Sequence, residues 1–219
     1  MLKSYIRMFK KRGILTCVHY FFQNHLFDIL HGTDTHKRIL KKDFKNKKLK
    51  NFKYGVLYMS SWTWHFNKIL NFLSFFLDKN LKSYKFYDVG SGKGKGLILI
   101  AKFLRKKNIK TKIYGLEYDK NLLQISSNNL LKLKLKKNVF LKNIEATQFK
   151  IKFKKSIIFL FNPFNEKVLK IFIKKFHFSE NFIVYTNPVH NNLLIKNKFK
   201  IIKKIKGFHS NNTTFIYRK

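Results

Sequence analysis

The sequence of 219 residues predicts an α/β fold built around a mostly parallel sheet. From residue 81 onwards, short apolar stretches alternate with longer stretches of helical periodicity, a pattern typical of strands joined by crossover helices. A glycine-rich turn joins the first of these strands to the helix that follows it. The preceding 80 residues are helical in character, and a chain of this length suits one domain with a substantial core.

The glycine-rich turn predicts a ligand-binding cradle. A strand over residues 86–89 contains Asp88, glycines follow at positions 90, 92, 94 and 96, and a helix is expected over 97–107. Glycine permits positive φ and leaves no Cβ between the chain and a ligand. The dinucleotide fingerprint does not fit, because its third glycine would fall on Lys95 or Leu97, and no glycine here has the sequel that a P-loop requires. A glycine turn without a ligand is the alternative.

The second strand, expected over residues 112–117, ends on Glu117. A carboxylate at the end of the strand beside the glycine turn can accept both hydroxyl hydrogens of a ribose. Asp119 is the expected N-cap of a helix over 121–135, where apolar residues recur at helical spacing. A third short strand is expected over 138–141. A solvated surface charge is the alternative interpretation of Glu117.

The fourth strand, over residues 156–161, is continuously apolar, as expected of a parallel strand that is covered on both faces. It stops at Asn162-Pro163-Phe164, beside the point where the strand order is expected to reverse and where ligands gather. A proline restricts the residue before it to an extended conformation. Asn162 is therefore expected to be extended and to direct its side-chain oxygen into the site.

A fifth strand, over residues 182–186, stops at Asn187-Pro188, which we interpret as a turn. The stretches 198–205 and 213–217 read as strands on either side of a polar turn. They predict an antiparallel pair at the end of the chain.

Four segments carry a resemblance to a known family. The turn Asp88-Val89-Gly90-Ser91-Gly92-Lys93-Gly94 resembles the first motif of class I S-adenosylmethionine-dependent methyltransferases. Together with Gly32-Thr33-Asp34-Thr35, Gly115-Leu116-Glu117 and Phe161-Asn162-Pro163-Phe164, it resembles a bacterial family of this class whose substrates are poorly defined. Residues 157–165 are also similar to the catalytic domain of Dot1-type lysine methyltransferases, which carry Asn-Phe where this chain has Asn-Pro-Phe. Amine and base methyltransferases with an Asn/Asp-Pro-Pro-Tyr/Phe motif are a third relative, although this chain lacks the second proline.

The resemblance implies a Rossmann-like fold with seven strands, residues 1–80 as a helical segment or lid, and residues 81–219 as a domain that binds S-adenosylmethionine. Glu145 follows the third strand, where this class usually carries an acidic residue, and its carboxylate suits the adenine amino group. An exposed loop glutamate is the alternative. The implied cofactor-binding residues are Asp88, Gly90, Ser91, Gly92, Gly94, Glu117 and Glu145. The implied catalytic residues are Asn162, Pro163 and Phe164.

The implied reaction is transfer of a methyl group to a nucleophile, which we expect to be an amine nitrogen, with protein lysine favoured. Oxygen acceptors usually need a general base, and no His or Asp stands beside the Asn-Pro-Phe motif to serve as one. Asn162 and the Pro163 carbonyl can accept N–H bonds from an amine, while Phe164 walls the site. Two alternatives stay open: methylation of RNA or another nucleic acid, and a non-catalytic basic protein that binds nucleic acid.

The formal net charge of +38 predicts a surface that attracts RNA, DNA, anionic lipid or acidic protein, more strongly at low salt. Only five of the 48 basic residues are arginine, the better residue for bidentate phosphate recognition. The excess is lysine, which AT-rich codons favour together with Phe, Ile and Asn, so base composition accounts for much of the charge. The densest segments, residues 45–53, 132–137 and 150–155, are spread along the chain and indicate a solvated surface rather than one groove.

Cys17 is the single cysteine, which excludes an internal disulfide and suits a reducing compartment, so we expect a cytoplasmic protein. We expect no metal centre, because the eight histidines are scattered, and no membrane span, because no apolar run is long enough. The first 30 residues predict a basic amphipathic helix that covers the substrate cleft or, alternatively, touches a membrane surface. Residues 32–35 and 58–64 are expected to form a lid, in which Trp62 and Trp64 are either cation–π partners or packing residues.

Overall fold

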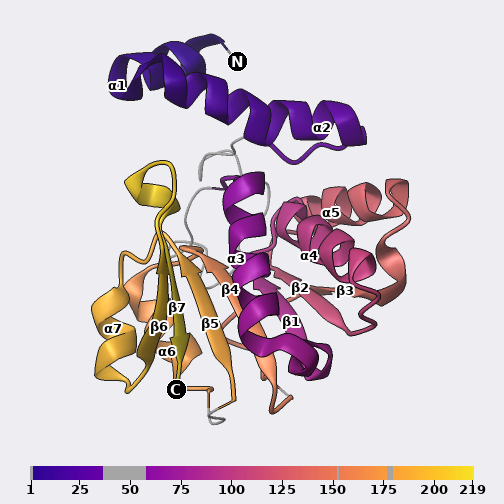
Figure 1. The fold of residues 1–219 in the computed structure, drawn as a ribbon, viewed down its shortest axis with the longest axis vertical. Helices are drawn as coiled ribbons and strands as arrows, with labels where there is room; N and C mark the ends of the chain where they lie inside the picture. Colours follow the sequence, from indigo (N-terminus) through magenta and orange to yellow (C-terminus); the bar gives the residue numbers. More distant parts are fainter. Residues whose placement is uncertain (1, 37–57, 152, 177–179) are drawn as a thin grey trace.

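The computed structural model describes residues 2–36, 58–151, 153–176 and 180–219. They form an α/β fold around a seven-stranded sheet with the strand order β3-β2-β1-β4-β5-β7-β6 (Figure 1). β7 is antiparallel to both of its neighbours, and the other strand pairs are parallel. The predicted seven-stranded sheet with a C-terminal antiparallel pair is confirmed. The strands are β1 (Lys85–Val89), β2 (Ile113–Glu117), β3 (Val139–Asn143), β4 (Ser156–Phe161), β5 (Phe182–Thr186), β6 (Lys200–Ile205) and β7 (Thr214–Arg218).

The strand order reverses between β1 and β4. β1 pairs with β2 on one side and with β4 on the other, so β2 and β3 extend the sheet in one direction while β4 and β5 extend it in the other. Ligands of open α/β sheets bind beyond the carboxyl ends of the strands at such a reversal. The topology therefore brings the residues that follow β1, β2 and β4 to one place on the edge of the sheet.

Both faces of the sheet are covered, and successive side chains of a strand alternate between the two faces. Phe86 and Ile157 pack in one hydrophobic cluster, with α3 (Thr63–Leu77), α4 (Lys95–Lys106) and α5 (Lys120–Lys132). Tyr87 and Ile158 pack in the other, with α6 (Glu166–Ile173) and α7 (Asn191–Lys196). The sequence assigned α3 to the N-terminal segment, yet Phe66 of this helix stacks on Phe159 of β4 with ring centroids 5.1 Å apart. Short 3-10 helices are η4 (Asp78–Ser83), η5 (Lys136–Asn138) and η6 (Ser210–Asn212).

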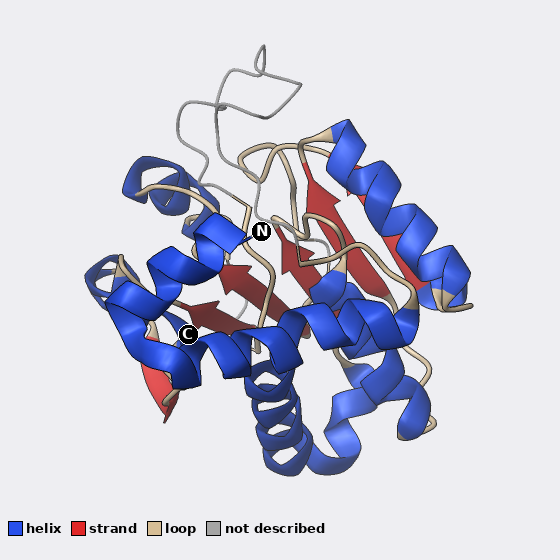
Figure 2. Cartoon of the chain, turned by 90° about the horizontal axis from the view of Figure 1, so that it is seen from above, coloured by secondary structure: helices blue, strands red, loops and turns tan. Residues whose placement is uncertain are grey.

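A nearly continuous helical segment, residues 2–31, lies across the carboxyl ends of the strands, and we call it the cover helix. It consists of α1 (Leu2–Tyr20), the π-helical turn η1 (Phe21–His25) and α2 (Leu26–His31). Figure 1 shows it above the sheet, and Figure 2, which looks down on this edge, shows it crossing over the strands. Gly13 bends α1 with a φ of 75°. No helix in the described ranges is long and apolar enough to span a membrane.

Asp28 organises the turn that follows the cover helix. Its carboxylate accepts hydrogen bonds from Thr33 Oγ1 (2.6 Å), from Thr35 N and Oγ1 (both 2.7 Å) and from His36 N (2.8 Å). Burial favours a raised pKa for Asp28, but these hydrogen bonds outweigh it and hold the pKa below its usual range. The predicted lid segment 32–35 is thus fixed in one conformation. The lysine-rich stretch 45–53 lies outside the described residues.

Candidate active site

The glycine turn after β1 has the conformation that the sequence predicts. Gly90, Gly92 and Gly94 have φ values of 76°, 52° and 84°, in the left-handed region that favours glycine. All three also lack room for a side chain because a neighbour approaches closely. A Cβ on Gly90 would lie 2.8 Å from Cβ of Pro163, and one on Gly92 would lie 2.1 Å from the ring of Tyr58. The turn therefore packs closely against both the segment after β4 and the segment before α3.

Glu117 links this turn to the end of β2. Its side chain is 4% exposed, and its two oxygens accept hydrogen bonds from the backbone N–H groups of Gly92 (2.9 Å) and Asp119 (3.0 Å). Asp119 in turn caps α5, as predicted, by accepting from Asn121 N (2.8 Å) and Leu122 N (3.0 Å). The Glu117 carboxylate is consequently held at the strand-order reversal and does not turn away from it.

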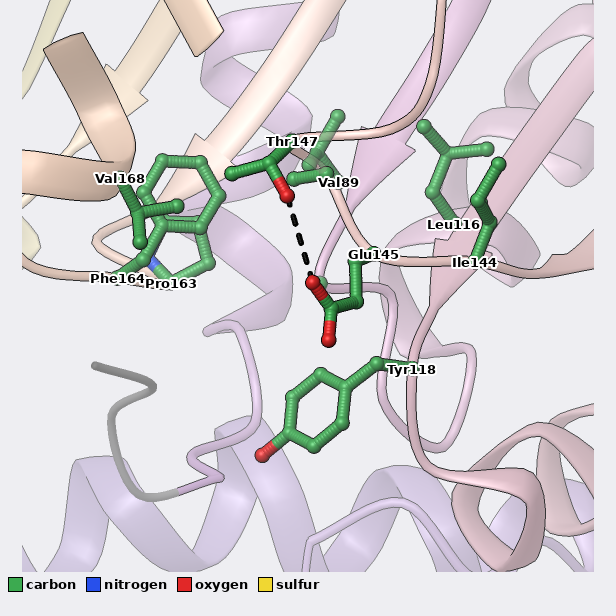
Figure 3. A pocket seen from close by; sticks show the side chains of 11 residues that line it. Val89, Leu116, Tyr118, Ile144, Glu145, Thr147, Pro163, Phe164 and Val168 are labelled. Atoms are coloured by element: carbon green, nitrogen blue, oxygen red, sulfur yellow. Dashed lines mark hydrogen bonds between the residues drawn. The ribbon is translucent and has the colours of Figure 1, made fainter. Parts of the chain in front are cut away.

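Two adjoining clefts open at this edge. The first, of about 520 Å³, we call the apolar cleft; Glu145 and Thr147 stand among its apolar walls and are joined by a 3.4 Å hydrogen bond (Figure 3). The second, of about 610 Å³, we call the polar cleft. Gly90, Tyr118 and Pro163 line both. Both volumes include space at the mouths of the clefts that is open to solvent. The apolar walls are Val89, Leu116, Ile144, Ala146, Phe164 and Val168, and the polar cleft contains Asp88, Ser91, Lys95 and Glu117.

The two carboxylates of the polar cleft, Asp88 and Glu117, both have raised pKa values. Burial, reinforced by the nearby charge of Glu117, raises the pKa of Asp88 to about 7. Burial also raises the pKa of Glu117 to about 7, although the N–H groups of Asp119 and Gly92 oppose the shift. Ionising both groups together is costly without a donor-rich or cationic ligand between them. The polar cleft therefore suits a ligand that presents hydroxyl or ammonium groups.

Lys95, the first residue of α4, is a buried cation in the polar cleft. Its side chain is 2% exposed, and Nζ donates to the carbonyl of Gln23 (2.5 Å) and to Oδ1 of Asn24 (2.9 Å), both in the cover helix. Burial lowers the pKa of Lys95 to about 7, and the charge of Asp28 opposes this shift only in part. The neighbouring loop lysine, Lys93, is also buried and pairs with Asp34 at 2.6 Å. Side chains of the glycine turn thus fasten the cover helix and its following turn.

The Asn-Pro-Phe segment differs from the expectation in two respects, the conformation of Asn162 and the direction of its side chain. Asn162 has a φ of 38° and is not extended, so the restriction imposed by Pro163 does not decide its conformation. Asparagine tolerates the left-handed region better than most residues, and Oδ1 of Asn162 accepts a 3.0 Å hydrogen bond from the Tyr185 hydroxyl. Asn162 does not line either cleft, whereas Pro163 lines both and Phe164 lines the apolar one. Asn187, before the other proline, is left-handed too.

Comparison with known proteins identifies the architecture. No family model and no curated protein matches the sequence. Solved structures do match the fold: a methyltransferase from Aquifex aeolicus that depends on S-adenosylmethionine has a TM-score of 0.51 and 15% identity, over 70% of this chain and 88% of that one. A ribosomal protein L11 methylase from Lactobacillus delbrueckii subsp. bulgaricus has a TM-score of 0.52 and 15% identity, over 69% and 78%. The chain has the class I methyltransferase fold.

A third structure of similar fold is a predicted N6-adenine-specific DNA methylase from Listeria monocytogenes, with a TM-score of 0.53 and 13% identity over 70% of this chain and 50% of that one. The names of these proteins point to different acceptors, a ribosomal protein in one case and DNA in another. The shared fold therefore does not define an acceptor for this chain.

Within this methyltransferase fold, most of the residues singled out by sequence come together at the clefts. Asp88, Ser91 and Glu117 line the polar cleft, Glu145 lines the apolar cleft, and Gly90 lines both. The other two positions of the glycine turn, Gly92 and Gly94, line neither cleft. Gly92 lies beneath Tyr58, and a Cβ on Gly94 would lie 2.3 Å from Oγ of Ser126 in α5. The Ser91 hydroxyl is buried and has no hydrogen-bond partner in the described part of the chain.

The sequence did not predict two residues that line the polar cleft, Lys95 and Tyr118. Lys95 lies within the glycine motif, but the sequence of the motif does not show whether a lysine side chain there is buried or exposed to solvent. Tyr58 belongs to the predicted lid and donates its hydroxyl to the carbonyl of Thr35 at 2.7 Å. The two tryptophans of that lid lie elsewhere. Trp62 packs edge-on against His209 at 4.9 Å, and Trp64 is 52% exposed.

We expect Asp88→Asn to stabilise the protein more at about pH 8 than at about pH 5. Because the pKa of Asp88 is raised in the folded protein, the unfolded chain releases this proton first as the pH rises, and stability is lost up to the folded pKa of about 7. Asparagine removes that loss, by about 1–3 kcal/mol. Urea unfolding at the two pH values measures the difference.

The exposed Glu166→Gln is the matched control and should show no pH-dependent gain. An Asp88→Asn effect of equal size at both pH values would show that the carboxylate is not a buried, perturbed acid.

Proposed function

We propose that this chain is an S-adenosylmethionine-dependent methyltransferase that methylates an amine nitrogen, with a protein lysine as the favoured acceptor. The observation that carries the proposal is the pairing of two clefts at the strand-order reversal. One cleft is apolar and has a carboxylate among its walls, and the other holds the buried carboxylate of Glu117, the half-buried carboxylate of Asp88 and the buried Lys95. A nucleoside with a zwitterionic amino-acid tail requires this combination of surfaces.

The nucleoside half is held by Glu117 and the apolar cleft in this proposal. Each Glu117 oxygen accepts one backbone N–H and retains a lone pair, so the carboxylate can accept both ribose hydroxyl hydrogens. Leu116, Ile144 and Phe164 pack against the base. Glu145 accepts hydrogen bonds from the adenine amino group.

The amino-acid half needs an acceptor for its ammonium group and a donor for its carboxylate. Asp88 supplies the acceptor and Lys95 the donor, and both line the polar cleft. Occupation of the cleft by a cationic group also favours the ionised forms of Asp88 and Glu117, whose pKa values are raised without it. Binding is therefore expected to relieve an electrostatic cost of the folded chain.

When bound, the cofactor supplies a methyl group on a sulfonium, which is already a strong donor. The protein contributes alignment and exclusion of water, effects that supply about 7–11 kcal/mol in a near-attack geometry. Pro163 lines both clefts, which supports the role that we assign to its carbonyl, acceptance of an N–H bond from the acceptor amine. Asn162 is fixed by Tyr185 and supports this segment, while Phe164 forms a wall.

The acceptor class has two competitors. The high positive charge favours RNA or DNA as the acceptor, and it equally suits a protein that binds nucleic acid without catalysis. The sequence favours an amine over a hydroxyl, because no His or Asp stands beside Asn162 to act as a general base. The retained carboxylates Asp88 and Glu117 favour catalysis over binding alone.

Glu117→Ala tests the cofactor site. We expect isothermal titration calorimetry to detect binding of S-adenosylmethionine to the unmodified chain, and the substitution to weaken binding by about tenfold or more, because hydrogen bonds to a charged group are lost. Glu166→Ala, at an exposed position, is the control and should bind as the unmodified chain does. No detectable binding by the unmodified chain would favour the non-catalytic alternative.

Lys95→Met tests how the amino-acid tail is held. We expect it to weaken S-adenosylmethionine by about tenfold, because a charge-assisted hydrogen bond is lost. It should leave the affinity for 5′-methylthioadenosine, which lacks the tail, nearly unchanged. Asn24→Ala removes a partner of Lys95 in the cover helix but keeps the ammonium group, so its affinity for S-adenosylmethionine should hold. An equal loss for both ligands in Lys95→Met would indicate a role in packing alone.

A tritiated-methyl transfer assay on fractionated cell extract tests the acceptor. We expect label in the protein fraction, on lysine, and a rate reduced by about a hundredfold in Asn162→Ala with little change in cofactor affinity, because the Asn-Pro-Phe segment orients the acceptor. Glu166→Ala again provides the matched control. Label in RNA or DNA would contradict the lysine assignment, and label in no fraction would contradict transfer itself.

A further inference from the structure

The cover helix turns several polar side chains inward, together with Cys17 and Phe27, and an apolar side outward. The inward residues include Thr16, Gln23, Asn24 and Asp28, which are between 0% and 5% exposed. Helices on globular proteins normally bury the apolar stripe and expose the polar face. The exposed side chains of this helix that we call the outer stripe are Ile14, Leu15, Val18, Phe21, Phe22, Ile29 and Leu30, between 41% and 71% exposed.

Hydrogen bonds to the body of the protein fix this orientation. The Gln23 carbonyl accepts from Lys95 Nζ and from Thr63 Oγ1 (2.8 Å), and Gln23 Oε1 accepts from Trp64 N (2.7 Å). Asn24 accepts from the same ammonium group of Lys95. Rolling the helix to bury the outer stripe would break these contacts and leave buried donors unpaired. The outer stripe is therefore held on the solvent-exposed side of the cover helix.

The charges on the cover helix have one sign at its surface. Arg7, Lys10, Lys11 and Arg12 are exposed next to the outer stripe. Asp28 is the sole acidic residue between positions 2 and 31, and it is buried in its own hydrogen-bond network. The surface therefore joins exposed apolar side chains to uncompensated positive charge.

Exposed apolar side chains beside positive charge favour a lipid surface over a second copy of the chain as the partner of the outer stripe. Two copies meeting through the outer stripe would bring together basic clusters of chains that each carry a formal charge of +38, which opposes association. An anionic bilayer attracts the same cluster and accepts the apolar side chains at the boundary of headgroups and acyl chains. We propose that the cover helix docks in the plane of an anionic membrane surface. This proposal stands independently of methyl transfer.

Vesicle co-sedimentation of the full chain tests the proposal at physiological salt. The probes are vesicles of equal parts phosphatidylcholine and phosphatidylglycerol, and vesicles of phosphatidylcholine alone. We expect binding to the anionic vesicles, with a partition coefficient reduced about tenfold or more in the triple variant Leu15→Gln/Phe22→Gln/Leu30→Gln, which keeps every charge. The matched control is Phe75→Gln/Ile171→Gln/Ile195→Gln, three exposed apolar residues on α3, α6 and α7, and it should bind as the unmodified chain does.

Three results would overturn the proposal. Binding to anionic vesicles that the outer-stripe variant leaves unchanged would show general attraction of a polycation. Equal binding to neutral vesicles would show that the basic cluster has no role. A concentration-dependent dimer in analytical ultracentrifugation that the outer-stripe variant abolishes would show that a second copy covers the stripe. Circular dichroism of both triple variants establishes that they remain folded, since all six positions are exposed.

Discussion

The Glu117 carboxylate is the interaction on which the rest of the site depends. It accepts the N–H of Gly92 from the turn after β1 and the N–H of Asp119 from the start of α5. The bond from Gly92 ties the turn after β1 to the end of β2, in addition to the bonds from the N–H groups of Gly90 and Ser91 to the Leu116 carbonyl. Burial of the Glu117 carboxylate raises its pKa, and a carboxylate in this position favours ligands that donate hydrogen bonds.

The backbone and the side chains of the glycine turn have different roles. Its backbone frames the polar cleft, while the side chains of Lys93 and Lys95 reach up to Asp34 and to the cover helix. The cover helix is thus attached directly to a residue that lines the polar cleft. A ligand group that bonds to Lys95 would compete with the contacts that attach the cover helix. The hydrogen bonds of Asp28 also connect the cover helix to residues 33–36.

Local sequence signals account for the framework well. β4 and β5 begin and end at the predicted residues, because each is an uninterrupted apolar run that Asn-Pro terminates. Asp119 acts as the predicted N-cap, and the spacing of glycines after Asp88 correctly located the turn. These features depend on contacts that lie close together in the chain, so the sequence carries them directly.

Long-range contacts account for what the sequence did not reveal. β7 lies between β5 and β6 although it follows both in the chain, and the left-handed Asn162 reflects a hydrogen bond from Tyr185. The inward direction of Lys95 depends on carbonyl and amide groups 71 and 72 positions away. The periodicity of the cover helix indicates two faces but cannot state which face the fold buries.

A crystal structure of the protein with S-adenosylhomocysteine tests the central claim most directly. We expect both ribose hydroxyls to lie within hydrogen-bond distance of Glu117, and the base to pack among Leu116, Ile144 and Phe164. A nucleoside found elsewhere, or a Glu117 side chain that turns away from an occupied cleft, would contradict it.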